Sequence, residues 1–201
     1  MHEKKKSPFS PRFTTASLAL IPAAIGINFV GKLVVSLLKL PLWMDSIGTI
    51  LASMLAGPWI GAIAGAVNNV IYGFQDPISI PYALTSVAMG VTVGVMAHYG
   101  WTKSFWRVIV LALVMCVIST IVSVPINIIF WEGMTGNVWG DAAYGIILAK
   151  THSVLLASTI DSLIIGIPDS IASVIIAWGL FKALPKNLLQ LYKTNTDVEE
   201  F

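Results

Sequence analysis

Hydrophobic residues are gathered in six long segments, separated by short breaks that contain polar residues, glycine or proline. Each segment predicts an apolar helix, because one membrane span takes about 20 residues. The break between the second and third segments is only Gly57-Pro58, which predicts a tight helical hairpin. The second segment is short for a span, and the last is long enough to tilt or to project beyond the bilayer. The segments cover about residues 14–38, 44–57, 59–74, 80–99, 105–131 and 153–183.

The composition also favours a membrane protein. Of 201 residues, 56% are hydrophobic and 11% are charged, whereas a soluble domain has about 25% charged residues. This excludes a soluble globule, a disordered chain and a coiled coil. We therefore predict an all-α integral membrane protein with six transmembrane helices in one compact bundle. Its predicted parts are a basic N-terminus (1–13), a six-span membrane domain with an outer substrate pocket (14–183) and a tail (184–201).

Lysine and arginine positions predict the orientation, because basic residues concentrate on the cytoplasmic side of a membrane. The first apolar run is too long for the core of a cleaved signal peptide, so we expect it to be a retained span. With six spans, nine basic residues lie on the side of the termini and three on the other. We therefore expect a multi-pass plasma-membrane protein with both termini cytoplasmic. The nine are Lys4, Lys5, Lys6, Arg12, Lys103, Arg107, Lys182, Lys186 and Lys193, and the three are Lys32, Lys39 and Lys150.

Two connections on the predicted outer side are candidates for contact with a ligand. The longer one, 132–152, mixes glycines, polar residues and an aromatic residue. Its apolar second half, 142–149, is expected to lie on the membrane or to fold down as a lid. The shorter one, 75–81, contains two prolines that restrict its backbone.

The sequence lacks several common motifs of enzymes and nucleotide-binding proteins. It has no Walker A loop, HExxH, GxSxG or paired-cysteine motif, and its three histidines are far apart. A net charge of +2 makes a nucleic-acid partner improbable. We therefore expect no enzyme activity, no metal and no cofactor. If the protein moves a solute actively, the energy comes from another subunit.

Polar side chains inside the apolar segments indicate a site, because such groups are costly in hydrocarbon and face a protein interior or a wet cavity. Asn28 and Lys32 are four residues apart and share one helix face. Most other candidates also fall in the outer half of their segments. This shared depth predicts a pocket for a polar, ring-containing molecule. The candidate substrate-binding residues are Asn28, Lys32, Asp45, Asn68, Tyr72, Tyr82, Asn127, Trp131, Trp139 and Asp161.

The same residues have simpler interpretations, which stay open at this point. A single asparagine can hydrogen-bond a neighbouring helix instead of a ligand, and outer tryptophans can form an interfacial belt. Lys32 and Asp45 can form a buried ion pair that has no ligand role. Asp169 lies deeper in the last segment, and we expect it to be structural or to act in coupling.

Two further features of the sequence carry a resemblance. Ala19 and Ala23 in the first segment form a small-xxx-small pattern that permits close helix approach. Leu40-Pro-Leu-Trp-Met-Asp-Ser-Ile-Gly-Thr49 is followed by Ala56-Gly-Pro-Trp-Ile-Gly-Ala-Ile-Ala-Gly-Ala66. With six segments in about 200 residues, these features resemble the substrate-binding S component of an energy-coupling factor transporter, over about residues 14–183.

The resemblance implies a function in vitamin uptake. An S component of this family binds a vitamin from outside with high affinity and docks onto a membrane coupling protein that carries two ATPases. The alanine motif of the family contacts the coupling protein, which implies this role for Ala19 and Ala23. The family's pocket lies in the outer span halves and loops, where the polar candidates are found.

The substrate is the least specific part of this expectation. The sequence resembles the cobalamin-type S components of lactobacilli somewhat more than other types, so cobalamin is the first expectation. Pyridoxine, pantothenate and riboflavin are alternatives. A stand-alone ion-coupled carrier and a membrane sensor or scaffold domain are two other function classes. Co-purification of ATPases with the chain would distinguish an S component from a carrier.

Overall fold

The computed structural model describes residues 8–9 and 13–192, and within them the regular secondary structure is all helical, with no β-strand. The remaining residues, 1–7, 10–12 and 193–201, include much of the predicted basic N-terminus and tail, which therefore lie outside the described residues. The helices are α1 (Thr15–Leu38), α2 (Ile47–Ala56), α3 (Pro58–Gly73), the 3-10 helix η1 (Pro77–Ser79), α4 (Ala83–His98), α5 (Phe105–Trp131), α6 (Val138–Thr151), α7 (Val154–Ala183) and α8 (Lys186–Tyr192).

Three helices, α1, α5 and α7, are long and apolar enough to cross a membrane. They expose large apolar side chains, such as Leu37 on α1 and Ile129 on α5, each 73% exposed, which suits contact with lipid. The all-α part of the prediction is confirmed, and the three long apolar helices fit a helical membrane protein. α2, α3 and α4 have 10, 16 and 16 residues, and at about 1.5 Å per residue α2 is only about 15 Å long. Six complete spans therefore stay a prediction.

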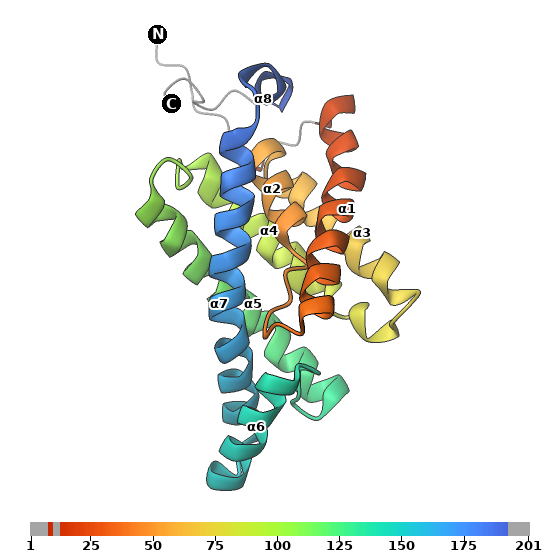
Figure 1. Cartoon of the computed structure of the whole chain (residues 1–201), viewed down its shortest axis with the longest axis vertical. Coiled ribbons are helices and arrows are strands. Elements are labelled where there is room, and N and C mark those ends of the chain that lie inside the picture. The colour runs from red at the N-terminus through yellow and green to blue at the C-terminus, as the bar shows by residue number, and fades with distance from the viewer. Residues whose placement is uncertain (1–7, 10–12, 193–201) are drawn as a thin grey trace.

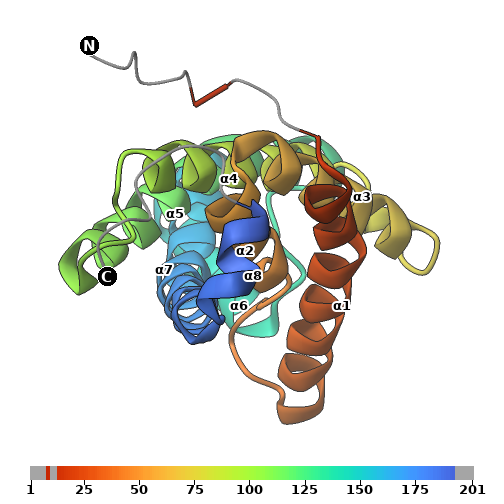
Figure 2. The same ribbon diagram turned by 90° about the horizontal axis from the view of Figure 1, so that it is seen from above.

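The arrangement separates two ends of the molecule. In Figure 1, α7 runs along the molecule, α6 packs beside its lower part, and α8 lies at the opposite end, near the start of α1. Viewed from above, α2 lies between α1 and α7, and it contacts both (Figure 2). The α6 end corresponds to the predicted outer side.

The predicted hairpin between the second and third segments is present. α2 ends at Ala56, and Pro58 is already the first residue of α3. The single residue between them, Gly57, has a φ of 86°, which glycine adopts without the strain of a side chain. Proline suits the first helical position because its missing N–H needs no partner there.

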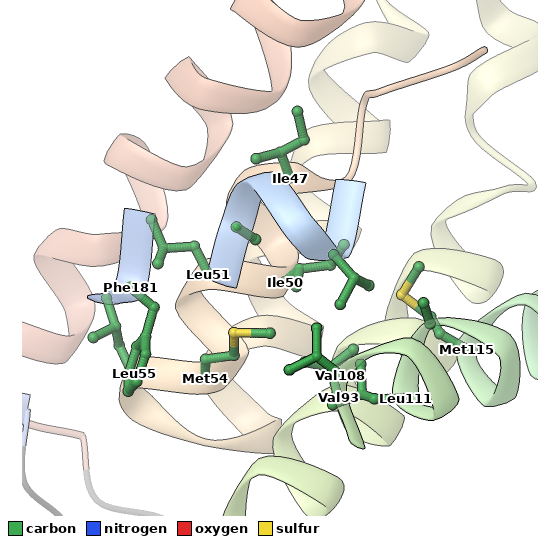
Figure 3. Packing of buried hydrophobic residues seen from close by; sticks show 13 residues of the cluster. Ile47, Ile50, Leu51, Met54, Leu55, Val93, Val108, Leu111, Met115 and Phe181 are labelled. Carbon is green, nitrogen blue, oxygen red and sulfur yellow. The ribbon is translucent and has the colours of Figure 1, made fainter. Parts of the chain in front are cut away.

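The short helix α2 is the centre of the core. Nine of its ten residues are buried, and it packs against α1, α3, α4 and α7. Figure 3 shows Ile50 and Met54 on the side of Val93 from α4 and Leu111 from α5, and Leu55 beside Phe181 from α7. A helix surrounded in this way needs apolar residues on all faces.

Close contact of the α1 and α2 backbones depends on Gly48. A Cβ added there would overlap the carbonyl oxygen of Ala24 on α1. We expect Gly48→Ala to lower the stability of the purified protein in detergent, by about 1–3 kcal/mol, as overpacking does. Thermal unfolding followed by circular dichroism measures this effect.

Gly26→Ala is the matched control on α1, because nothing lies within 4 Å of a Cβ added at Gly26. Alanine is also the better helix former by about 1 kcal/mol, so the control should melt at the same temperature or higher. Equal melting temperatures for Gly48→Ala and the parent would contradict the proposed close approach.

Candidate functional site

Asn28 on α1 forms hydrogen bonds with α2 through both atoms of its side-chain amide. Its side chain is fully buried, and its Oδ1 accepts hydrogen bonds from the backbone N–H groups of Gly48, at 2.7 Å, and Thr49, at 3.4 Å. Its Nδ2 donates to Thr49 Oγ1 at 3.0 Å. Because the first N–H groups of a helix lack partners within it, Asn28 satisfies the N-terminal end of α2. The interpretation of this asparagine as a link between helices is therefore favoured over ligand contact.

Lys32 and Tyr72 form the first group of predicted residues that come together. The Lys32 ammonium lies 4.1 Å from the centre of the Tyr72 ring, a cation–π arrangement, and Phe29 stacks on the same ring at 6.3 Å between centroids. Lys32 and Asp45 do not form a salt bridge within 4.0 Å, but they interact electrostatically. Burial raises the pKa of the Asp45 carboxyl, and the charge of Lys32 acts in the opposite direction.

Asn68 and Tyr72 on α3 carry polar atoms that lack partners. Both side chains are buried, and Asn68 Oδ1 and the Tyr72 hydroxyl have no hydrogen-bond partner within the protein. The neighbouring Asn69 differs, because its Nδ2 donates to Gly65 O and to Ser86 Oγ. A buried polar atom without a partner costs about 1–3 kcal/mol, so Asn68 and Tyr72 are better candidates for ligand contact than Asn28 or Asn69.

Tyr82 and Asn127 form a second group, where α4 begins and α5 ends. The Tyr82 hydroxyl donates to Asn127 Oδ1 at 2.6 Å, and Asn127 Nδ2 donates to Ser162 Oγ on α7 at 3.3 Å. Burial raises the pKa of Tyr82 to about 12, so the phenol is a protonated donor at neutral pH. These bonds tie three elements together and occupy both ends of the Asn127 amide.

Asp161 belongs to this second group. It is fully buried; its Oδ1 accepts from Thr135 Oγ1 at 3.2 Å, and its Oδ2 has no partner within the protein. A Cβ added at Gly140 would overlap Asp161 Oδ1, so the first turn of α6 covers this carboxyl. The 132–152 connection therefore lies over a predicted site residue, as expected for a lid. Its apolar half is helical rather than irregular, within α6.

The two predicted tryptophans differ in their surroundings. Trp131, at the end of α5, has a buried Nε1 without a hydrogen-bond partner and lies near the Tyr82 hydroxyl. Trp139 is 62% exposed on α6, because Gly140 and Tyr144 form the buried face of that helix. Its side chain therefore lies outside both groups.

The predicted coupling residues lie on the exposed face of α1. Ala19 and Ala23 are exposed, while α1 buries a different set of residues against the bundle: Ser17, Ala24, Asn28, Gly31 and Val35. Gly26 continues the exposed face with open space around it. A second helix could approach this face closely.

Asp169 has a structural role that the sequence left open. Its Oδ1 accepts hydrogen bonds from the backbone N–H groups of Trp43 and Met44, both at 2.8 Å. This contact draws the 39–46 connection into the bundle and thereby positions Asp45. Such a long-range contact between a side chain and a backbone group leaves no spacing pattern in the sequence.

Sequence reasoning did not select Thr135, Asp141, Ser158 or Ser162. Two signals could have found some of them. Ser158, Asp161 and Ser162 recur at three- and four-residue spacing, which places them on one face of α7. Asn137 precedes an apolar run in the pattern of a helix N-cap, which would have indicated a helix with Asp141 in its first turn. In the structure the Asn137 side chain accepts from Trp139 N at the start of α6.

Comparison with protein-family models, with curated proteins and with solved structures finds no match.

The hydrogen bonds of Asp169 give a test of the fold around the site. Asp169→Ala leaves the part-buried N–H groups of Trp43 and Met44 without an acceptor. A fully buried unpaired group costs about 1–3 kcal/mol, so for two part-buried groups we expect the unfolding free energy in detergent to fall by about 2–4 kcal/mol. Asp169→Asn keeps an acceptor oxygen and is the matched control, so it should lose less. An alanine variant that melts like the parent would show that the 39–46 connection is held by other contacts.

Proposed function

We propose that the chain is the substrate-binding membrane subunit of an ATP-driven importer, an S component that binds a vitamin at the α6 end. The binding of ATP and its hydrolysis belong to two ATPase partners, joined through a membrane coupling protein. In this proposal α1, α2, α3, α4, α5 and α7 are the six spans, the termini are cytoplasmic, and the membrane is the plasma membrane.

The observation that carries this proposal is a set of buried polar atoms that have no hydrogen-bond partner among the described residues. They come from four different helices: Asn68 and Tyr72 on α3, Thr85 on α4, Trp131 on α5, and Ser158 and Asp161 on α7. Ser173 is the one member of the set deeper in α7. Natural proteins leave few buried polar groups unpaired, so several of them on four helices of one bundle favour a site that a polar ligand completes.

The exposed small residues of α1 support the second half of the proposal. Ala19 and Ala23 lie toward the α8 end of α1 and face away from the bundle. The helix therefore offers one face to the core and another to a partner helix in the membrane. A binding subunit that docks onto a coupling protein needs such a face.

The ligand order rests on the sequence resemblance, with cobalamin first and pyridoxine, pantothenate and riboflavin as alternatives. The internal hydrogen bonds bear on which polar residues are free to contact a ligand. Asn28 and Asn127 are occupied by internal bonds, which leaves Asn68, Tyr72 and Asp161 as the leading contacts.

A binding assay tests the site. We expect purified protein to bind one vitamin of the panel tightly, and Asn68→Ala and Tyr72→Phe to weaken that binding. A lost hydrogen bond that leaves a buried partner unpaired costs about 1–3 kcal/mol, or roughly 5- to 150-fold in affinity. Isothermal titration calorimetry measures the affinity.

Two matched controls lie on exposed positions away from the site. Asn187→Ala on α8 and Tyr99→Phe after α4 make the same substitutions at exposed positions and should bind like the parent. The site assignment is wrong if both site variants keep the parent affinity. The whole proposal fails if no vitamin binds to folded protein.

A second experiment tests coupling. We expect Ala19→Trp or Ala23→Trp to reduce recovery of co-expressed coupling protein and ATPases by at least about 10-fold, because bulk prevents close helix approach, while vitamin binding stays unchanged. Leu18→Trp is the control: Leu18 is also exposed but lies about 100° around the helix from Ala19. Full complex recovery and uptake in both alanine variants, or concentrative uptake by the chain alone, would argue for a different mechanism.

A further inference from the structure

Asp161 is a buried carboxyl that lacks a counter-charge. Its side chain is fully buried, its one side-chain donor is Thr135 Oγ1, and Oδ2 has no partner within the protein. Among the described residues, no lysine, arginine or histidine forms an ion pair with it. A buried carboxylate is ordinarily paired with a cation or held by several residues, whereas Asp161 has no paired cation and is held by Thr135 alone.

A second carboxyl, Asp141 of α6, lies beside Asp161. The single Thr135 hydroxyl lies 3.5 Å from Asp141 Oδ1 and 3.2 Å from Asp161 Oδ1, and its one hydrogen cannot serve both oxygens fully. The backbone N–H groups of Thr135 and Gly136 donate to the same Asp141 oxygen, which fixes its position. Two like charges held close together oppose each other, and a positive group between them would remove this repulsion.

Ser158 is an independent sign that a ligand completes this place. It lies one turn before Asp161 on α7, so the two side chains share a helix face. The serine is fully buried, and its Oγ has no hydrogen-bond partner within the protein. The Tyr82 hydroxyl interacts electrostatically with both carboxyls.

We propose that the Asp161–Asp141 pair receives a positively charged nitrogen of the transported ligand. The inference rests on the proposed function and names the chemical class of its substrate: an organic cation with a protonated amine or a cationic ring. Asp161 Oδ2 accepts a charge-assisted hydrogen bond or faces the cation directly, and Ser158 supplies a neutral hydroxyl beside it. A ligand that presents a carboxylate or phosphate here is repelled.

This ranking differs from that of the sequence resemblance. Pantothenate carries a carboxylate, and riboflavin and cyanocobalamin present neutral groups, so none of them supplies the missing charge. The carboxyl pair thus favours a cationic ligand over cobalamin. Gly140 in the first turn of α6 covers Asp161. This turn must therefore move before a ligand of either kind can reach the carboxyl.

A charge-matched panel decides between these ligands. The probes are thiamine and pyridoxamine as cations, pyridoxine, riboflavin and cyanocobalamin as neutral ligands, and pantothenate as an anion, with Na⁺, K⁺ and Ca²⁺ added separately. Binding is measured by calorimetry and thermal shift on the purified full chain. We expect the tightest ligand to be a cation, and Asp161→Asn to weaken it by roughly 10- to 150-fold, the value of a hydrogen bond to a charged group.

The controls separate charge from folding. Lys103→Gln removes a charge at an exposed position between α4 and α5, and it should bind like the parent. Ser158→Ala should weaken binding of the cationic ligand several-fold. Its control is Ser36→Ala, the same substitution at an exposed position. If Asp161→Asn does not fold, Asp141→Asn takes its place, because Asp141 is only half-buried. We expect this variant to bind the cation more weakly as well.

Each remaining outcome overturns the inference. Tight binding of a neutral or anionic vitamin, or of any vitamin that Asp141→Asn and Asp161→Asn bind like the parent, leaves the proposed function standing but removes the cation site. Stabilisation by Na⁺, K⁺ or Ca²⁺ alone that depends on Asp161 assigns the pair to an inorganic ion. If folded protein binds none of the vitamins, the proposed function and the inference fail together.

Discussion

The position of α2 depends on the hydrogen bonds that hold its N-terminal end. Asn28 on α1 accepts from the first N–H groups of α2, and Asp169 on α7 accepts from the connection just before it. In an apolar environment water cannot satisfy these groups, so the side chains must do so. The remaining core follows from this arrangement, because α2 touches α1, α3, α4 and α7 and is buried over nearly its whole length.

Polar residues in this bundle divide into two kinds. Asn28, Asn69, Asn127 and Asp169 are bonded within the protein and join elements that are far apart in the sequence. Asn68, Tyr72, Ser158 and Asp161 are buried with atoms left unpaired. The first kind contributes to stability, and the second kind costs stability in the isolated protein. A ligand that supplies the missing partners would recover this cost on binding, which is how unpaired groups give both affinity and specificity.

The two ends of α1 illustrate how one helix can serve two purposes. In its C-terminal half, Lys32 lies over Tyr72, within the first group of candidate residues. Toward the α8 end, Ala19 and Ala23 are exposed and leave a smooth surface. In the proposed function, α1 is therefore the helix that connects the ligand site with the docking face.

The sequence alone determined the helices and the class of protein. Apolar runs and the Gly57-Pro58 break predicted α1, α2, α3, α4, α5 and α7 to within a few residues, because these properties are local. The low content of charged residues indicated the class of protein. It also indicated the depth of the polar residues, since position along a span sets depth. It did not anticipate that α6 is helical, because its pattern of polar, small and apolar residues is weak.

Only the tertiary structure decided which polar residues have partners. Asn28 and Asn68 are both asparagines in apolar segments, but Asn28 meets the N-terminal end of α2 while Asn68 Oδ1 meets no donor. Asp161 and Asp169 are eight residues apart on one helix, yet Asp169 accepts two backbone N–H groups and Asp161 faces a second carboxyl. Hydrogen bonds depend on distances of about 3 Å between segments that are far apart in the chain. Those distances arise only when the helices pack, so no pattern along the sequence records them.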